Sequence, residues 1–274
     1  MARFEGKVAF VTGGARGQGR SHAVNLARHG ADVVVLDICD QIPSVQYPMA
    51  TDADLAETAR LIEKEGRAAL PMKVDVRDYD AVCGAVAMTV STFGHVDLVV
   101  ANAGIMASLG PQGREIAAWH AAIETMLSGV FYTVFETTKP MVDSGRGGSI
   151  VITGSTSSFE GVAFDSRVLT PGQVGYGAAK HGVLAIMRNF AKALGRHNVR
   201  VNLVAPAGVD TPMVRNEYFD EFREMTPPWW GQNAMNTALA EPQDVSEAVL
   251  WLLSEAARYV TGTTIAVDSG HLIM

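Results

Sequence analysis

Tyr176 and Lys180, four positions apart, carry the side chains that an alcohol–ketone interconversion requires. Oxidation of a secondary alcohol removes a hydride from carbon and a proton from oxygen, so a general base must stand beside the hydride acceptor. A free tyrosine has a pKa of about 10, and a nearby cation favours its phenolate. Four residues apart on a helix, the two side chains project from one face. These residue types would suit Tyr176 as general acid/base, with Lys180 tuning it and also able to hold the hydroxyls of a nicotinamide ribose, but their spacing alone does not establish these roles.

Ser155 completes the predicted catalytic set. It follows an apolar run at residues 149–153 that indicates a strand, and its hydroxyl would stabilise the charge that develops on the substrate oxygen. A tyrosine and a lysine at this spacing also occur as a packing or surface pair. Because open α/β sheets bind ligands at the ends of their strands, the position of Ser155 favours the catalytic interpretation.

A glycine-rich turn precedes the first predicted helix. Gly13, Gly17 and Gly19 stand in the segment 12–19, after a predicted strand at 8–11. Glycine permits a tight turn and lets a helix N-terminus approach a pyrophosphate, whose charge the free N–H groups favour. Ordinary turns also collect glycine, so this pattern needs support from elsewhere in the chain.

Asp37 supplies that support. It ends the second predicted strand, at 33–36, and stands 18 residues after Gly19. A carboxylate there accepts hydrogen bonds from the adenosine ribose and repels a 2′-phosphate, which predicts NAD as the cofactor. Arg16, a cation in the glycine turn, is able to meet such a phosphate, so NADP remains the alternative.

Short apolar runs alternate with helical stretches along the chain. Strands are predicted at 8–11, 33–36, 69–74, 98–101, 149–153, 199–204 and 264–267, and helices at 21–29, 55–65, 79–93, 117–144, 176–194 and 245–254. The alternation predicts a single-domain, Rossmann-type α/β fold over residues 1–274, with a doubly wound parallel sheet of about seven strands flanked by helices. Strands that are apolar at nearly every position fit burial on both faces.

Composition narrows the functional classes. The 274 residues are 48% apolar with a net charge of -7, which favours a globular chain and disfavours a nucleic-acid partner. Cys39 and Cys83 belong to no metal-binding cluster, so we expect no metal and a reducing cytoplasm. The sequence shows neither an apolar leader nor a membrane-spanning run, so no membrane partner is expected.

Taken together and in order, the motifs resemble those of the short-chain dehydrogenase/reductase family, from Gly6 to about Gly270. The resemblance implies Ser155, Tyr176 and Lys180 as catalytic residues. It also implies an adenine-contacting pair after the third strand, a short motif after the fourth and a nicotinamide loop at 206–211. The predicted cofactor-binding residues are Gly13, Arg16, Gly17, Gln18, Gly19, Asp37, Ile38, Asp75, Val76, Asn102, Ala103, Gly104, Tyr176, Lys180, Pro206, Gly208, Val209 and Thr211.

More narrowly, residues 13–22, 37–39 and 179–183 resemble a carveol-dehydrogenase-like, mycofactocin-associated subgroup of the family. The polar segment 39–52 directly follows Asp37, and it is expected either to fold over the adenine or to form a surface insertion. In the first case, NAD would be held tightly and reoxidised by an external electron carrier.

Met126 marks a departure from the family pattern. Relatives place an asparagine there that helps to organise a water relay to the lysine, whereas a thioether is only a weak acceptor. Ser128 or a shifted water would substitute, or turnover is slow, or the protein binds nucleotide with vestigial catalysis. Because the three catalytic residues are present, retained activity is predicted.

Residues 213–241 fall where relatives have a mobile substrate lid. Their apolar and aromatic side chains would line a site for an apolar alcohol or ketone, or pack the lid or a subunit interface. These residues are Met213, Tyr218, Phe219, Phe222, Met225, Trp229, Trp230 and Met235. Residues 164–174 are predicted as an inserted loop beside the substrate entrance. Relatives commonly form tetramers, so a homotetramer is expected.

Overall fold

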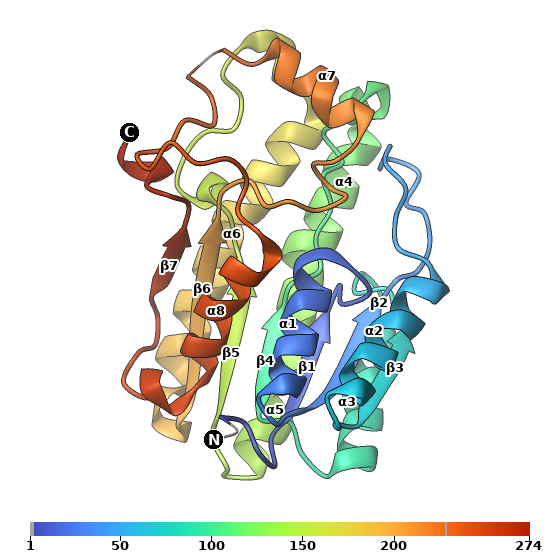
Figure 1. The fold of residues 1–274 in the computed structure, drawn as a ribbon, viewed down its shortest axis with the longest axis vertical. Coiled ribbons are helices and arrows are strands. Elements are labelled where there is room, and N and C mark those ends of the chain that lie inside the picture. The colour runs from blue at the N-terminus through green and yellow to red at the C-terminus, as the bar shows by residue number, and fades with distance from the viewer. Residues whose placement is uncertain (1–2, 228) are drawn as a thin grey trace.

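Seven parallel strands form one sheet in the order β3-β2-β1-β4-β5-β6-β7 (Figure 1). The computed structural model describes residues 3–227 and 229–274. The strands are β1 (Val8–Thr12), β2 (Asp32–Asp37), β3 (Ala69–Lys73), β4 (Leu98–Ala101), β5 (Gly148–Thr153), β6 (Val199–Pro206) and β7 (Thr264–Val267). The predicted Rossmann-type fold is confirmed, because each predicted apolar run coincides with a strand.

Helices cover both faces of the sheet (Figure 1). They are α1 (Gly17–Arg28), α2 (Asp52–Lys64), α3 (Tyr79–Phe93), α4 (Ile116–Ile123), α5 (Gly129–Asp143), α6 (Pro171–Leu194), α7 (Glu217–Met225) and α8 (Pro242–Leu253). One hydrophobic layer joins the sheet to α3, α5 and α6, and a second joins it to α1, α2 and α8. α7 lies beyond the carboxyl ends of the strands.

The side chains of successive strand residues pack alternately into these two layers. In β2, Val34 and Leu36 pack with the α3, α5 and α6 layer, whereas Val33 and Val35 pack with the opposite layer. A strand that is buried on both faces must be apolar at nearly every position. This explains the continuous apolar runs in the sequence.

The strand order reverses between β1 and β4. The sheet extends from β1 through β2 to β3 on one side, and from β4 to β7 on the other. The loops that leave the carboxyl ends of β1 and β4 therefore diverge, and such a crevice is where open α/β sheets bind ligands.

Most helix bounds differ from the predicted ones by a few residues, and two segments show the main departures. The helix predicted at 117–144 consists of α4, a π-helical turn (Glu124–Ser128) and α5 in succession. The helix predicted to begin at residue 176 begins at Pro171, because the Thr170 side chain accepts from the N–H of Gln173 and proline suits the first helical turn. The loop predicted at 164–174 is correspondingly shorter and contains a 3-10 turn (Ser166–Val168).

Within residues 3–227 and 229–274, no helix combines the length and apolar character that a membrane span requires. The same residues contain no group of three or more His, Cys, Asp or Glu side chains that could hold a metal ion. Cys39 and Cys83 are free thiols.

Candidate active site

A cavity of about 280 Å³ opens at the carboxyl ends of β1 and β4. It is lined by every residue that the sequence predicted for catalysis or cofactor binding, from Gly13 in the first loop to Thr211 after β6. Loops that are far apart in the sequence thus contribute to one site. Their positions agree with the expected convergence at the strand ends.

The glycine turn has no room for side chains at two positions. Gly13 has a φ of +65°, and a Cβ there would stand 2.7 Å from the Cα of Ala103. A Cβ on Gly19 would collide with the carbonyl oxygen of Gly13. Glycine therefore allows the first and fourth loops to approach each other closely and leaves the backbone open toward the cavity.

The N-terminus of α1 reaches this cavity without a side-chain cap. Its N-cap, Arg16, makes no capping hydrogen bond, whereas Thr51 and Asp78 cap α2 and α3 with their side chains. The uncapped N–H groups and the positive end of the helix dipole suit a pyrophosphate. The carboxamide oxygen of Gln18 is buried there without a partner among the described residues. The donors and the open turn fit a dinucleotide.

Asp37 ends β2 at the cavity wall. Its carboxylate accepts hydrogen bonds from the backbone N–H groups of Ala15 (3.0 Å) and Cys39 (3.4 Å). Burial raises the pKa of Asp37, and these hydrogen bonds together with the charge of Arg16 offset part of the rise. The carboxylate lies directly beside the glycine turn, as the predicted contact with a ribose requires.

Side-chain hydrogen bonds fix the loops after β3 and β4. Arg77 donates to both carboxylate oxygens of Asp75 at 2.6 to 3.0 Å. Burial by itself raises the pKa of Asp75. The hydrogen bonds from Arg77 together lower this pKa by more than burial raises it, so the net shift is downward. Asn102 donates to the carbonyl oxygen of Thr12 (3.1 Å) and accepts from the hydroxyl of Thr153 (3.2 Å). Asn102 therefore holds the ends of β1, β4 and β5 together.

Ser155, Tyr176 and Lys180 lie on the same cavity wall. Ser155 is the N-cap of the short turn after β5 and accepts from the N–H of Ser157 (3.2 Å), which fixes the position of its hydroxyl. The Lys180 ammonium donates to the carbonyl oxygen of Thr153 (2.8 Å). These bonds come from residues at the end of β5, so that strand end positions the predicted catalytic set.

Burial changes the acidity of two of these groups. It raises the pKa of Tyr176, an effect that a hydrogen bond with the Ser155 hydroxyl partly offsets. Burial also lowers the pKa of Lys180 to about 8. Both shifts have the same cause, because a poorly solvated site disfavours the charged form of each group. An amine with a pKa near 8 is suited to exchanging a proton at neutral pH.

Met126 lies in the π-helical turn and is 1% exposed. A Cβ on Gly104 would stand 3.7 Å from its sulfur, so the thioether packs against the loop that follows β4. Ser128, one of the substitutes considered for the missing amide, is not among the residues that line the cavity, whereas Thr125 is. The hydroxyl of Thr125 is buried without a partner among the described residues.

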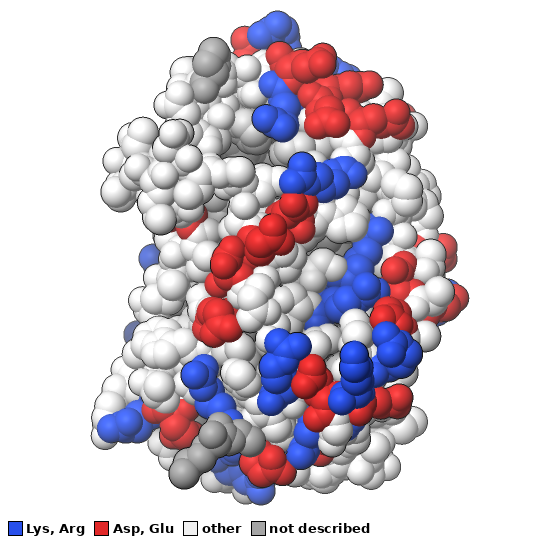
Figure 2. Space-filling view, viewed as in Figure 1, with Lys and Arg blue, Asp and Glu red and all other residues white. Residues whose placement is uncertain are grey.

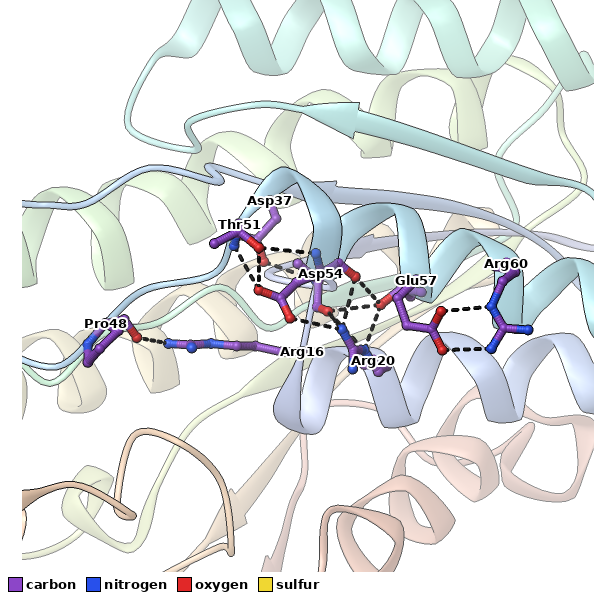
Figure 3. Close-up of polar contacts among 10 residues, drawn as sticks. Arg16, Arg20, Asp37, Pro48, Thr51, Asp54, Glu57 and Arg60 are labelled. Atoms are coloured by element: carbon purple, nitrogen blue, oxygen red, sulfur yellow. Dashed lines mark hydrogen bonds and ion pairs between the residues drawn. The ribbon is translucent and has the colours of Figure 1, made fainter.

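Residues 39–52, called the insert below, fold over the cavity. Tyr47 and Met49 line it, and the Tyr47 hydroxyl accepts from the N–H of Met106 (3.1 Å). Figure 3 shows Arg16 reaching from the glycine turn to the carbonyl oxygen of Pro48 (2.5 Å). The expectation of a surface insertion is therefore wrong, because the insert contributes to the cavity wall. Its contact with adenine stays a prediction.

Described residues of the segment 213–241 form a further part of the cavity wall. Of the eight side chains predicted there, Met213, Phe219, Phe222 and Trp230 line the cavity, Tyr218 and Met225 line a neighbouring one, and Trp229 and Met235 are exposed. The Phe222 ring meets those of Trp230 and Phe164, with centroids 5.3 and 6.1 Å apart. Aromatic contacts thus join this segment to the loop before α6.

Several residues that the sequence did not predict also line the cavity. Ser108 and Gln173 are polar, and Val162 and Ile105 are apolar. Gln173 stands three positions before Tyr176, so the helical repeat would have placed it on the same face if the helix had been predicted to begin early enough. No local pattern marks Ser108, because only the packing of its loop brings it to the site.

The surface shown in Figure 2 carries basic and acidic side chains interspersed, with acidic ones gathered over α7. α7 contributes Glu217, Asp220, Glu221 and Glu224 to that group. This face therefore presents no broad basic surface of the kind that binds a polyanion.

The chain is similar to known oxidoreductases over its whole length. The family model described as Enoyl-(Acyl carrier protein) reductase matches residues 13–271. A (-)-trans-carveol dehydrogenase of Rhodococcus erythropolis is 41% identical over 98% of this chain and 99% of its own. An uncharacterized oxidoreductase of Mycobacterium tuberculosis is 46% identical over 98% of this chain and 97% of its own. The crystal structure of carveol dehydrogenase from Mycobacterium avium in complex with NAD superposes with a TM-score of 0.90 and 40% identity, covering 100% of both chains.

Proposed function

We propose that this chain, which belongs to the short-chain dehydrogenase/reductase family and is an NAD-dependent oxidoreductase, interconverts a secondary alcohol and its ketone with Tyr176 as general acid/base. One observation carries the proposal: Ser155, Tyr176 and Lys180 line the same cavity as the uncapped N-terminus of α1. Hydride transfer requires the reacting carbon beside the nicotinamide, and a cavity shared by these residues supports the proposal that base and cofactor meet there.

The chain's own residues divide the work of oxidation. Ser155 donates a hydrogen bond to the substrate oxygen, and Tyr176 receives the proton of the alcohol at its phenolic oxygen. Lys180, held by the Thr153 carbonyl, stabilises the phenolate and binds the ribose hydroxyls. NAD supplies the hydride acceptor when it is bound. In the direction of reduction, Tyr176 donates the proton.

The wall formed by residues 213–241 favours an apolar substrate, and we propose that the segment is a lid. Phe222, Trp230 and Met213 offer no charge to a ligand, so a small alicyclic alcohol of the carveol kind suits the space. The similarity to carveol dehydrogenases supports the same class of substrate.

The insert supports a further part of the proposal, that NAD is held tightly and reoxidised by an external electron carrier, as the resemblance to mycofactocin-associated enzymes implied. Arg16 and Pro48 connect the glycine turn to the insert across the cofactor side of the cavity. We also propose a homotetramer, because relatives commonly form tetramers, and a location in the cytoplasm, because the two cysteines suit a reducing compartment.

A panel of alicyclic secondary alcohols and ketones, carveol among them, tests the reaction. Product formation is measured by gas chromatography with an artificial electron acceptor present, because a firmly bound cofactor would yield little free NADH. Turnover of at least one alcohol is expected. Absence of product for the whole panel, with NAD still bound, would favour the vestigial alternative that Met126 raised.

A further inference from the structure

A partly polar partition separates the main cavity from a second one of about 290 Å³. Three residues line both spaces: Ser108, Gln173 and Phe222. Phe222 gives the partition an apolar side, and the other two residues contribute polar groups to it. A polar group that faces an apolar ligand without a partner costs free energy, so such groups call for a matching group on the ligand.

The backbone of Ser108 packs closely against the first turn of α6 because of a glycine there. A Cβ on Gly172 would collide with the carbonyl oxygen of Ala107 and lie 2.9 Å from the Cα of Ser108. The absence of a side chain at Gly172 therefore lets the loop after β4 rest directly on the helix. Close backbone packing thus brings Ser108 to the turn of α6 that carries Gln173.

The hydrogen bond of Gln173 fixes the orientation of its amide. Its Nε2 donates to the carbonyl oxygen of Val162 (2.8 Å), and only the NH₂ side of an amide makes such a bond. The amide oxygen remains as an acceptor, and it has no hydrogen-bond partner in the part of the chain that the structure describes. The Ser108 hydroxyl likewise has no partner there and is able to donate.

Gln173 lies close to the reacting centre. It precedes Tyr176 by three residues in α6, so both side chains project from one face of the helix, about 5 to 6 Å apart at Cβ. Ser108 and Ser155 line the same cavity as these two side chains. A ligand whose oxygen contacts Tyr176 and Ser155 therefore shares this space with Gln173 and Ser108.

We propose that Ser108 and Gln173 form a second polar anchor that binds a hydroxyl group on the substrate, across the ring from the carbon that reacts. That hydroxyl donates to the amide oxygen of Gln173 and accepts from the hydroxyl of Ser108. The inference rests on the proposed function and deepens it, because it names the substrate class as cyclic diols and hydroxyketones.

Paired substrates test this inference directly. Cyclohexane-1,4-diol is compared with 4-methylcyclohexanol, in which a methyl group replaces the second hydroxyl. The wild-type protein should favour the diol in kcat/KM by at least about tenfold, since a site built to hydrogen-bond a hydroxyl rejects an analogue without it. Equal kcat/KM for the two alcohols would overturn the inference.

Two variants locate the effect. Ser108→Ala and Gln173→Leu should each raise KM for the diol about tenfold and remove most of the preference for the diol over 4-methylcyclohexanol in kcat/KM. Asn189→Leu, which replaces an exposed amide on the same helix, should change neither alcohol. An unchanged preference in Ser108→Ala, a substitution that leaves the Gln173 bond to Val162 intact, contradicts the inference even if Gln173→Leu fails to fold.

A binding measurement separates this inference from the proposed reaction. Calorimetry on NAD-loaded Tyr176→Phe protein should show that the diol binds more tightly than 4-methylcyclohexanol, and that adding Ser108→Ala abolishes the difference. Tighter binding of the diol, without any turnover by the wild-type protein, would contradict the proposed reaction and support the polar anchor. Turnover of both alcohols, with equal binding affinity for the two, would contradict the polar anchor and support the proposed reaction.

Discussion

The Lys180 ammonium lies 5.8 Å from the centroid of the Tyr176 ring, and its hydrogen bond goes to the Thr153 carbonyl. A strand end thus holds the cation beside the phenol. The ammonium has three donors and uses one of them on Thr153, which leaves donors for a cofactor ribose and for a water. The same arrangement fixes the distance between the base and the cation.

Tyr176→Phe removes the hydroxyl that takes up the proton. General acid/base groups contribute about 10²- to 10⁴-fold, so kcat should fall within that range while NAD content is unchanged. Tyr259→Phe, at a tyrosine that is 90% exposed, is the matched control and should retain full activity. Steady-state kinetics and nucleotide release on denaturation provide the two readouts. Wild-type kcat in Tyr176→Phe would exclude it as the base.

Lys180 makes the stability of the protein depend on pH. Its folded-state pKa of about 8 lies below the ordinary lysine value of 10.5, so the unfolded chain binds more protons between these values. The free energy of unfolding should therefore rise with pH from about 8 to 10.5, by up to about 1.4 kcal/mol per pH unit. Denaturant titrations of protein without added nucleotide measure it. Lys180→Met should lose this rise and Lys192→Met, at an exposed position, should keep it; identical pH profiles for the wild type and Lys180→Met would refute the assignment.

Asp37→Asn tests the basis of cofactor choice. The change keeps a hydrogen-bond acceptor near the Ala15 N–H and removes the charge that repels a 2′-phosphate. A charge effect of about 1 to 2 kcal/mol corresponds to a roughly tenfold gain in the ratio of NADP to NAD affinity. Asp40→Asn, at an exposed carboxylate nearby, should leave the ratio unchanged. Fluorescence titration with both reduced cofactors decides the matter, and a constant ratio in Asp37→Asn would remove Asp37 from that role.

Arg16→Ala tests whether the insert retains NAD. The change removes the bond to the Pro48 carbonyl (2.5 Å), so bound NAD should dissociate roughly tenfold faster, the equivalent of about one hydrogen bond to a charged group. Arg28→Ala, at the other end of α1 and paired with Glu65, is the control. Exchange against isotope-labelled NAD gives the rate. Equal exchange in the wild type and Arg16→Ala would separate the insert from cofactor retention.

His271 ties the carboxyl-terminal turn to two loops. Its ring nitrogens contact the Gln232 carbonyl (2.6 Å) and the Glu160 carboxylate (3.0 Å), two acceptors that only a doubly protonated ring satisfies. Burial by itself lowers the pKa of His271. The two hydrogen bonds and the charges of Glu160 and Asp268 together raise this pKa by more than burial lowers it, so the net shift is upward. The stabilisation is therefore complete below pH 6.5 and is lost as pH rises through the folded-state value.

Hydrogen exchange measures this effect. Residues 229–237 should exchange faster at pH 8.5 than at pH 6, after correction for the intrinsic rates. His271→Gln should exchange rapidly at both pH values, whereas His120→Gln, a change at a histidine on α4, should behave as the wild type. Slow, pH-independent exchange in the wild type would count against the contact.

The sequence by itself determined the strands and the glycine turn and predicted the candidate catalytic set, because each depends on short-range chemistry. Burial on both faces demands apolar strands, a tight turn demands glycine at Gly13, and a helical repeat places Tyr176 and Lys180 on one face. The early start of α6 was missed, since the cap at Thr170 stands outside the apolar pattern.

Tertiary structure alone decided which polar groups share the cavity. The sequence of the insert predicts a polar loop. Tyr47 is nevertheless buried in the cavity wall, because a backbone N–H from the loop after β4 donates to its hydroxyl. Ser108 packs against the first turn of α6 only because Gly172 admits close backbone approach, a contact between segments more than 60 residues apart. Such contacts depend on how the whole chain packs, and no local pattern encodes them.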